Sequence, residues 1–342
     1  MDKTILLGKD LLELSDICIK NDLPKFHGEQ LYKWMYQKSI LNINDMSNIP
    51  IKLKTIISDN YRINVLTTEK KISSQNEDTI KYLFKTSDNK LIESVSMIDN
   101  KRHTLCISSQ IGCSVDCDFC ATAKMGIIRN LDCGEIIQQL IIISNERKIP
   151  ITNIVFMGMG EPFLNYKNVI KSCKIMNDSK GFNLSSKKIT ISTSGILPKI
   201  EKFISEKHKY KLAISLNASN NITRDKLIPI NKKWPIENIL LAIKKYNYKK
   251  YRPIMFEYVL MEGINDSEQN AIELSKLLKN INCKINIIPY NETEGHYRRS
   301  NKIEMFVKQL KKINSDYRVL IRWSKGQDID AACGQLATQI DG

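Results

Sequence analysis

The sequence lacks any apolar run long enough to cross a bilayer. Stretches such as residues 140–143 are interrupted by polar side chains within a few positions, whereas a membrane-spanning helix needs about 20 apolar residues. The N-terminus, MDKTILLGKDLLEL, is too acidic and its apolar stretch too short for a signal peptide. We therefore expect a cytoplasmic protein without a membrane partner.

Arginine is also scarce, with ten residues against 42 lysines. The formal net charge is nonetheless +15, and a basic surface attracts the phosphate backbone of nucleic acids. AT-rich codons would also give a composition rich in lysine, isoleucine and asparagine, so the charge alone favours a nucleic-acid partner only modestly over a solvated lysine-rich surface. No self-association motif is visible, which predicts a monomer.

A structural disulfide framework is not expected, because nine cysteines in a cytoplasmic protein would be kept reduced. Cys18, Cys133, Cys173 and Cys283 lie singly in apolar or helical contexts. We expect these four to be small buried hydrophobic residues. The other five cysteines are candidates for metal ligation or catalysis.

Residues 1–90 are predicted to form an N-terminal accessory domain. A chain of 342 residues accommodates one large and one small domain. Helical periodicity covers residues 9–20 and 28–37, and alternation covers 64–69 and 79–85. Basic and aromatic side chains here could contact RNA, but an amphipathic helix that buries Trp34 in a small core is the stronger interpretation.

Residues 91–342 show a different pattern, in which short apolar runs alternate with amphipathic helices. The expected strands are 103–109, 153–157, 188–193, 211–216, 254–260, 284–288 and 319–322. The expected helices include 134–146, 166–177, 235–246, 267–278 and 302–313. This alternation is typical of an α/β fold with a parallel sheet. We predict a full or partial (β/α) barrel, with an open doubly wound sheet as the alternative.

Unusual residues gather directly after the expected strands, where barrel enzymes hold their chemistry. These loops are 112–120, 158–162, 192–195, 215–217 and 289–291. The strands were assigned without reference to these loops, so the clustering supports both the barrel and a site at its C-terminal face.

The strongest motif is Cys113-x-x-x-Cys117-x-x-Cys120, in SSQIGCSVDCDFCATAKMG. Structural zinc needs four protein ligands, and no loop residue nearby supplies the fourth, since His103 and Cys106 lie in the preceding strand. Three cysteines suit a four-iron four-sulfur (4Fe–4S) cluster with one iron open to another ligand. An open iron indicates chemistry at the cluster, whereas a zinc-bearing, non-catalytic nucleic-acid-binding protein is an alternative.

The CxxxCxxC spacing after the first barrel strand resembles the radical S-adenosylmethionine (SAM) superfamily, whose open iron binds the amino and carboxylate groups of SAM. The resemblance implies reductive cleavage of SAM to methionine and a 5′-deoxyadenosyl radical. GMGEP, at 158–162, resembles the superfamily's SAM-binding motif. Gly158 and Gly160 would let the backbone approach a ligand, and Glu161 would accept hydrogen bonds from an ammonium group.

Five segments together closely resemble the bacterial radical-SAM enzymes that methylate carbon 2 of adenosine. They are TLCISSQIGC, FMGMGEP, ITISTSG, IPYN and WSKGQDIDAACGQLA, between about residues 93 and 335. The resemblance implies two substrates, 23S ribosomal RNA in the peptidyl-transferase region and transfer RNA at the adenosine 3′ of the anticodon. Carbon 2 of adenine is electron-poor and cannot attack the methyl group of SAM, whereas a cysteine thiolate can.

The same resemblance assigns three catalytic residues. Cys333 would take a methyl group from one SAM to become S-methylcysteine, and a second SAM would give the radical that activates this methyl for addition to RNA. Cys106 would resolve the covalent adduct through a transient disulfide with Cys333, later reduced by a cellular thiol system. Glu93, in KLIESVSM, would accept the carbon 2 proton, although a solvated strand carboxylate is the alternative. A flavodoxin-type electron donor is also implied.

Several further residues match SAM contacts of the family. They are Ser192, Ser215, Leu216, Asn217 and Asn291. Each alone is more typical of a turn or cap. Asn217 stands where much of the family has histidine; a backbone contact to SAM would survive this difference.

Two alternatives lie within the superfamily. One is methylation of carbon 8 of the same ribosomal adenosine, against which Pro162 is weak evidence because that group has alanine there. The other is a radical-SAM enzyme for a small molecule, which the Cys106 and Cys333 pair and the basic charge disfavour.

Overall fold

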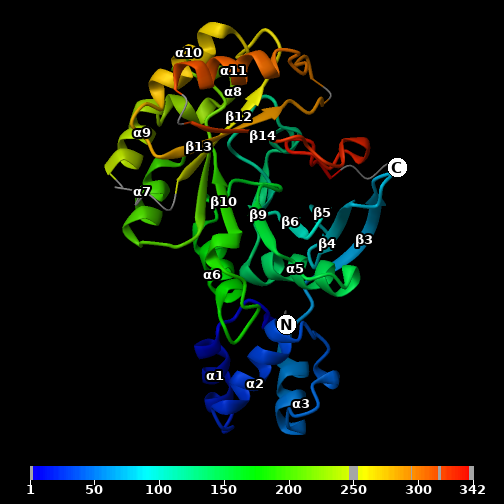
Figure 1. Cartoon of the computed structure of the whole chain (residues 1–342). Helices are drawn as coiled ribbons and strands as arrows, with labels where there is room; N and C mark the ends of the chain where they lie inside the picture. Colours follow the sequence, from blue (N-terminus) through cyan, green and yellow to red (C-terminus); the bar gives the residue numbers. More distant parts are fainter. Residues whose placement is uncertain (1–2, 246–252, 294, 315–316, 339–342) are drawn as a thin grey trace.

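The computed structural model describes residues 3–245, 253–293, 295–314 and 317–338. A small helical unit at the N-terminus lies against a larger α/β unit built around one curved sheet (Figure 1). Within these residues, no helix has the length and apolarity that a membrane crossing requires.

The N-terminal unit is built from three short helices and a two-stranded sheet. Its elements are β1 (Thr4–Ile5), α1 (Leu11–Lys20), α2 (Phe26–Tyr32), a π-helical turn (Lys33–Gln37), a 3₁₀ turn (Ile43–Asp45), α3 (Ile51–Asn60) and β2 (Tyr61–Arg62). Asp10 is the N-cap of α1 and forms a capping box with Glu13. Trp34 and Tyr36 are buried, so the interpretation of this helical region as a core-forming segment is confirmed.

The main sheet contains ten strands in the described residues, in the order β14-β13-β12-β11-β10-β9-β6-β5-β4-β3. Seven of them are parallel. These are β6 (Arg102–Cys106), β9 (Asn153–Phe156), β10 (Ile189–Thr193), β11 (Lys211–Ser215), β12 (Ile254–Leu260), β13 (Cys283–Pro289) and β14 (Arg318–Ile321). All seven expected strands are present. The end strands β14 and β3 are not neighbours in this part of the chain, so the predicted partial barrel is confirmed.

Helices connect the parallel strands, as parallel pairing requires. They are α5 (Cys133–Arg147), α6 (Tyr166–Asn177), α7 (Leu197–Ser205), α8 (Asn221–Leu227), α9 (Ile236–Lys245), α10 (Glu268–Leu277) and α11 (Ile303–Ile313). The five helices expected from periodicity are among them, and α7 and α8 are additional. The last residue of the helix expected over 235–246 lies outside the described residues.

Three antiparallel strands extend the parallel part of the sheet. They are β3 (Leu66–Ser73), β4 (Thr79–Thr86) and β5 (Leu91–Asp99), and β5 pairs with β6. The domain boundary predicted between residues 90 and 91 therefore falls inside one meander. Residues 87–90 form a tight turn with Asn89 at φ 60°, rather than a linker, because Thr86 N and Lys90 O close the hairpin with a hydrogen bond.

The helical unit and the barrel share one continuous hydrophobic core. The side-chain oxygen of Gln138 on α5 accepts hydrogen bonds from the backbone of Val65 and Leu66, at 2.6 and 3.0 Å. Lys171 on α6 forms an ion pair with Glu13 at 2.6 Å. The N-terminal unit is therefore anchored on α5 and α6, on the side of the barrel away from the strand-end loops (Figure 1).

Candidate active site

The loop after β6 carries the three clustered cysteines and is framed by a small hairpin. The hairpin pairs β7 (Gln110–Gly112) with β8 (Ile127–Asn130), and α4 (Ala121–Lys124) lies between them. Gly112 has φ +74°, and a Cβ there would collide with the carbonyl of Gly126. The hairpin therefore needs glycine at this position. Its tight closure fixes the two ends of the cysteine loop.

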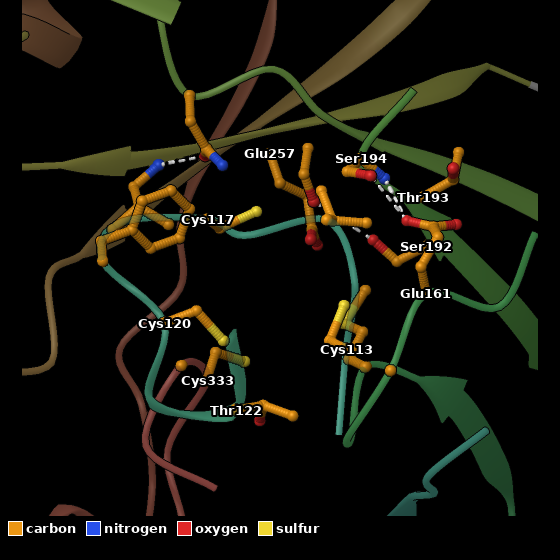
Figure 2. Close-up of a pocket in the computed structure, with 18 of the residues that line it drawn as sticks. Cys113, Cys117, Cys120, Thr122, Glu161, Ser192, Thr193, Ser194, Glu257 and Cys333 are labelled. Carbon is orange, nitrogen blue, oxygen red and sulfur yellow. Dashed lines mark hydrogen bonds between the residues drawn. The ribbon is translucent and has the colours of Figure 1, made fainter. Parts of the chain in front are cut away.

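All three cysteines line one cavity at the C-terminal ends of the strands, together with Cys333. Figure 2 shows Cys333 beside Cys120, with Cys113 on the other side of the cavity. The pKa of the Cys113 thiol is raised to about 12, chiefly by burial, with smaller contributions from Glu161 and Cys120. In the described residues, no three cysteine, histidine or carboxylate side chains are grouped closely enough to hold a single metal ion.

Glu161 and Gly160, in the loop after β9, line the same cavity. The Glu161 carboxylate accepts hydrogen bonds from Ser194 N and Ser194 Oγ, both at 2.7 Å, and from Phe163 N at 2.9 Å. A Cβ on Gly160 would collide with Gln110. Gly160 is therefore required where the β9 loop packs on β7, while its backbone also lines the cavity.

The predicted strand-end contacts divide into two groups. Ser192, Ser215 and Asn217 line the cavity, and the hydroxyls of Ser192 and Ser215 lie 3.4 Å apart. Asn217 adopts φ +55°, and its side chain caps the backbone of Val259 at 2.9 Å. Leu216 is fully buried, and it is not among the cavity-lining residues.

Asn291 also differs in placement from the expected SAM contact. Its side-chain amide donates to the carbonyl of Cys333 at 3.0 Å, and its oxygen accepts from Gln327 at 2.9 Å. Asn291 thus holds the segment that carries Cys333. The backbone of Gly334, with φ +88°, accepts a hydrogen bond from Ala121 at 2.8 Å and ties the same segment to the cysteine loop.

Cys106 ends β6 and is buried close to Cys333. Each thiol carries a pKa above its usual value, chiefly through burial, and the Cys333 sulfur contributes to raising the pKa of Cys106 to about 12. Arg322 opposes this effect at both thiols. All nine cysteines are free, so the structure contains no disulfide between Cys106 and Cys333. The four cysteines expected to be simple core residues are all buried.

Glu93, on β5, faces a second cavity on the other side of the segment that carries Cys333. Segment residues from Asp328 to Asp330 contribute to this cavity with Gln335, Ala337 and Thr338, whereas Cys333 and Gly334 line the first. Glu93 Oε1 lies 3.5 Å from Lys81 Nζ, and Oε2 is buried without a hydrogen-bond partner. Burial raises the pKa of Glu93 to about 7, and the Lys81 charge opposes the rise.

Comparison with known proteins identifies the family of the chain. Residues 107–275 match a model described as the radical SAM superfamily, and residues 4–63 match one described as the ribosomal RNA large subunit methyltransferase N-terminal domain. A protein from Clostridium novyi named probable dual-specificity RNA methyltransferase RlmN is 42% identical over 334 residues, which cover 97% of each chain. The chain belongs to the RlmN family.

Other members of the RlmN family agree over similar lengths. The protein of the same name from Thermotoga maritima is 40% identical and covers 92% of each chain. A crystal structure of a radical SAM methyltransferase from Sphaerobacter thermophilus superposes with a TM-score of 0.93 at 36% identity, covering 97% of this chain and 99% of that one. The predicted fold and family are therefore confirmed, and the alternative of a non-catalytic zinc protein is not supported.

Membership of the radical SAM superfamily implies a 4Fe–4S cluster and SAM. The donor set fits these groups. Three thiols, the usual ligands of such clusters, share a cavity with strand-end hydroxyls, an amide and backbone glycines that suit a polar cofactor. Cys113, Cys117 and Cys120 would hold the cluster, and Ser192, Ser215 and Asn217 would contact SAM.

Sequence reasoning missed four charged residues of the RlmN-family site. Arg322 lies close to Cys106 and Cys333, and its Nη1 is 3.5 Å from Oε1 of Glu257, which also contacts Ser192. Lys81 faces Glu93, and Arg224 is buried behind the cysteine loop. A carboxylate inside the apolar strand IMFEYVL was a usable signal for Glu257. The other three carry no local signal, because their partners are distant in sequence.

Proposed function

We propose that this chain methylates carbon 2 of adenosine in 23S ribosomal RNA and in transfer RNA through an S-methylcysteine intermediate. One observation carries the proposal: Cys333 lines the cavity of the three cluster cysteines, while its own segment also borders the cavity that Glu93 faces. A methyl carrier between these two cavities can receive a methyl group on one side and meet RNA on the other.

When bound, the cluster and two SAM molecules per turnover supply a methyl group and a carbon radical that removes hydrogen from a methyl. The chain's own residues arrange the rest. The Cys333 thiol loses its proton and its sulfur forms a bond to the methyl carbon, which leaves the sulfonium of SAM. Arg322 favours this step because its positive charge lowers the pKa of the Cys333 thiol against the effect of burial.

Glu93 would accept the proton from carbon 2 of the adenine once the base is joined to the Cys333 methyl carbon and the radical adduct has lost one electron, which the cluster, when bound, would take up. Its unpartnered oxygen is buried at the second cavity, and a carboxyl with a pKa of about 7 is well matched to proton transfer near neutral pH. Lys81 holds the other oxygen and also donates to the carbonyl of Asp330 at 3.3 Å. Lys81 therefore links Glu93 to the segment that carries Cys333.

Cys106 would then release the product. Its thiolate attacks the sulfur of Cys333, a disulfide forms, and the bond between that sulfur and the methylene carbon breaks, so the carbon stays on the RNA as a methyl group after protonation. A cellular thiol system reduces the disulfide. The close electrostatic coupling of the two thiols supports this role.

The partners follow from this route. RNA meets the basic surface of a chain with net charge +15, and lysines 70, 81 and 124 line the second cavity. A flavodoxin-type donor would deliver the electron that SAM cleavage needs, and the chain would act as a monomer in the cytoplasm.

The experiment is to replace Cys106 with alanine and to search the purified protein for RNA attached to Cys333, by nuclease digestion and peptide mass spectrometry. A methylene-linked adenosine on Cys333 is expected, because the adduct forms and cannot be resolved. Cys283→Ala, which changes a buried cysteine on β13, is the matched control and should carry no adduct. An absent adduct in cluster-loaded Cys106→Ala protein would refute the proposed route, and 8-methyladenosine in products of the parent enzyme would refute carbon 2.

A further inference from the structure

Arg224 on α8 is a fully buried cation at the centre of the strand-end loops. Its Nε donates to the carbonyl of Leu216 at 2.9 Å, and its Nη2 donates to the carbonyls of Ser194 and Ser215 at 2.5 and 3.1 Å. Its Nη1 donates to the side-chain oxygen of Asn231 at 2.8 Å. One side chain thus ties the C-terminal ends of β10 and β11, which carry residues assigned to SAM.

The positive charge of Arg224 has no carboxylate in direct contact within the described residues, since all four acceptors are neutral oxygens. The neighbouring carboxylate, Asp225, accepts a hydrogen bond from the amide of Asn231 at 2.6 Å, and its charge contributes less than Cys117 to raising the pKa of Arg224 against the effect of burial. Burial lowers the pKa of Arg224 to about 10, so the guanidinium remains charged at neutral pH. A buried charge of this kind is costly unless an opposite charge lies close to it.

The cysteine loop is the element that packs against this cation. Asp118 N donates to the carbonyl of Leu227, the last residue of α8, at 3.1 Å. Leu227 also belongs to a small apolar cluster that includes Val115 and borders Cys117. The Cys117 sulfur is close enough to raise the pKa of Arg224 against the effect of burial. The cation therefore stands behind a cysteine expected to bind the cluster.

We propose that Arg224 is a positioning residue that balances the negative charge of the thiolate-bound cluster while it holds the ends of β10 and β11. The inference rests on the cluster-binding role proposed above for Cys113, Cys117 and Cys120. Three thiolates make such a cluster net negative, and reduction adds another negative charge. A fixed cation nearby stabilises the reduced form, because the potential of a cluster depends on the charges around it.

The test compares the parent protein with Arg224→Gln, Arg224→Lys and Asn231→Ala after anaerobic reconstitution. Iron and sulfide are counted, and the midpoint potential is followed by electron paramagnetic resonance during a redox titration. Arg224→Gln removes the charge, Arg224→Lys keeps it but loses the forked contacts, and Asn231→Ala removes one contact without a change of charge. Thermal unfolding of each protein without iron reports on the fold separately.

In Arg224→Gln we expect the ratio of reduced to oxidised cluster, at the parent's midpoint potential, to fall by about tenfold, which corresponds to about 59 mV for one electron. Arg224→Lys and Asn231→Ala should stay near the parent potential although their unfolding temperatures fall. An unchanged potential in Arg224→Gln, or an equal fall in Asn231→Ala, would overturn the inference.

Two further outcomes, an unfolded variant and a parent protein without a cluster, also have a defined meaning. If Arg224→Gln does not fold, Arg224→Lys alone decides, because the proposal requires lysine to preserve the potential and its loss would refute the role of charge. If the parent protein itself binds no iron and sulfide, the cluster assignment under the proposed function fails. A normal parent cluster with insensitive variants refutes only the role of Arg224.

Discussion

The two cavities that border the Cys333 segment differ sharply in charge. Among the described residues that line the first, only Glu161 and Glu257 are charged, and the rest are thiols, hydroxyls, glycines, an amide and apolar side chains. The second is lined by three lysines, two glutamates and two aspartates. The difference teaches that one side of the segment suits a buried cofactor, while the other, with charged side chains of both signs, suits polar contacts and proton transfer.

The two cavities would not have separate roles if a substitution in the first cavity also abolished RNA binding. We expect Cys117→Ala to lose bound iron and sulfide and all detectable methylation, because one of three cluster ligands is gone. RNA affinity, measured by filter binding, should match that of the parent since the second cavity is intact. Cys283→Ala, a buried cysteine outside both cavities, should retain its metal and its activity.

The converse change lies in the second cavity. Glu93→Gln keeps the size of the side chain but removes the base, so we expect turnover to fall by about 10² to 10⁴. Iron content and the methylation of Cys333 should be normal, and RNA should accumulate on Cys333 because proton removal follows addition. Mass spectrometry of the peptide with Cys333 checks this. Turnover at the parental rate in Glu93→Gln would show that another group accepts the proton.

The pH dependence of the reaction rate tests the role of the second cavity without a mutation. Glu93 has a raised pKa of about 7, and only its deprotonated form can accept a proton. The rate of proton loss from carbon 2 should therefore rise with pH up to about 7 and level off above it, with roughly a tenfold loss per pH unit well below. Single-turnover assays from pH 5.5 to 8.5 measure this rate. A rate that is flat across pH 6 to 8 would contradict the assignment.

Replacing Lys81 in the second cavity should have a smaller effect, a shift of the pH–rate profile. Its charge lowers the pKa of Glu93, so Lys81→Met should move the acidic limb of the rate profile to higher pH. Lys81→Arg retains a cation and should leave the limb nearer its original place. The groups that share the cavity with Glu93 are Lys70, Lys124, Glu292, Asp328 and Asp330. At pH values well above the limb, the rates of Lys81→Met and parent should converge; a shift to lower pH would refute this account.

The smallest expected effect concerns the segment itself. Asn291→Ala removes the hydrogen bond to the Cys333 carbonyl, which should lower the free energy of unfolding by about 1 kcal/mol and slow methyl transfer to Cys333. Asn177→Ala removes a similar contact to the Leu184 carbonyl, far from the site. It should lose comparable stability but no activity. Equal activity losses in the two variants would mean that the Cys333 contact has no special role.

The sequence predicted the elements that depend on local pattern. Apolar runs such as ITIST gave the parallel strands, and the CxxxCxxC spacing with the Cys333 context gave the family. It predicted a domain boundary between residues 90 and 91, although β4 pairs with β5 across this point, because strand pairing leaves no local signal in the sequence. The contacts of Arg224 and Asn291 were likewise missed, since side chains that bind distant backbone carbonyls look like ordinary helix or loop residues.

The segment that carries Cys333 also has a consequence for folding. Several of its hydrogen bonds join partners more than 200 residues apart, including Gln75 N with Asp328 and Thr122 Oγ1 with the Leu336 carbonyl. Contacts that close such long loops carry a high entropic cost and tend to form late. The reactive thiol therefore reaches its place only after both the meander and the last strand have folded, so a partly folded chain would have a cysteine loop but no methyl carrier beside it.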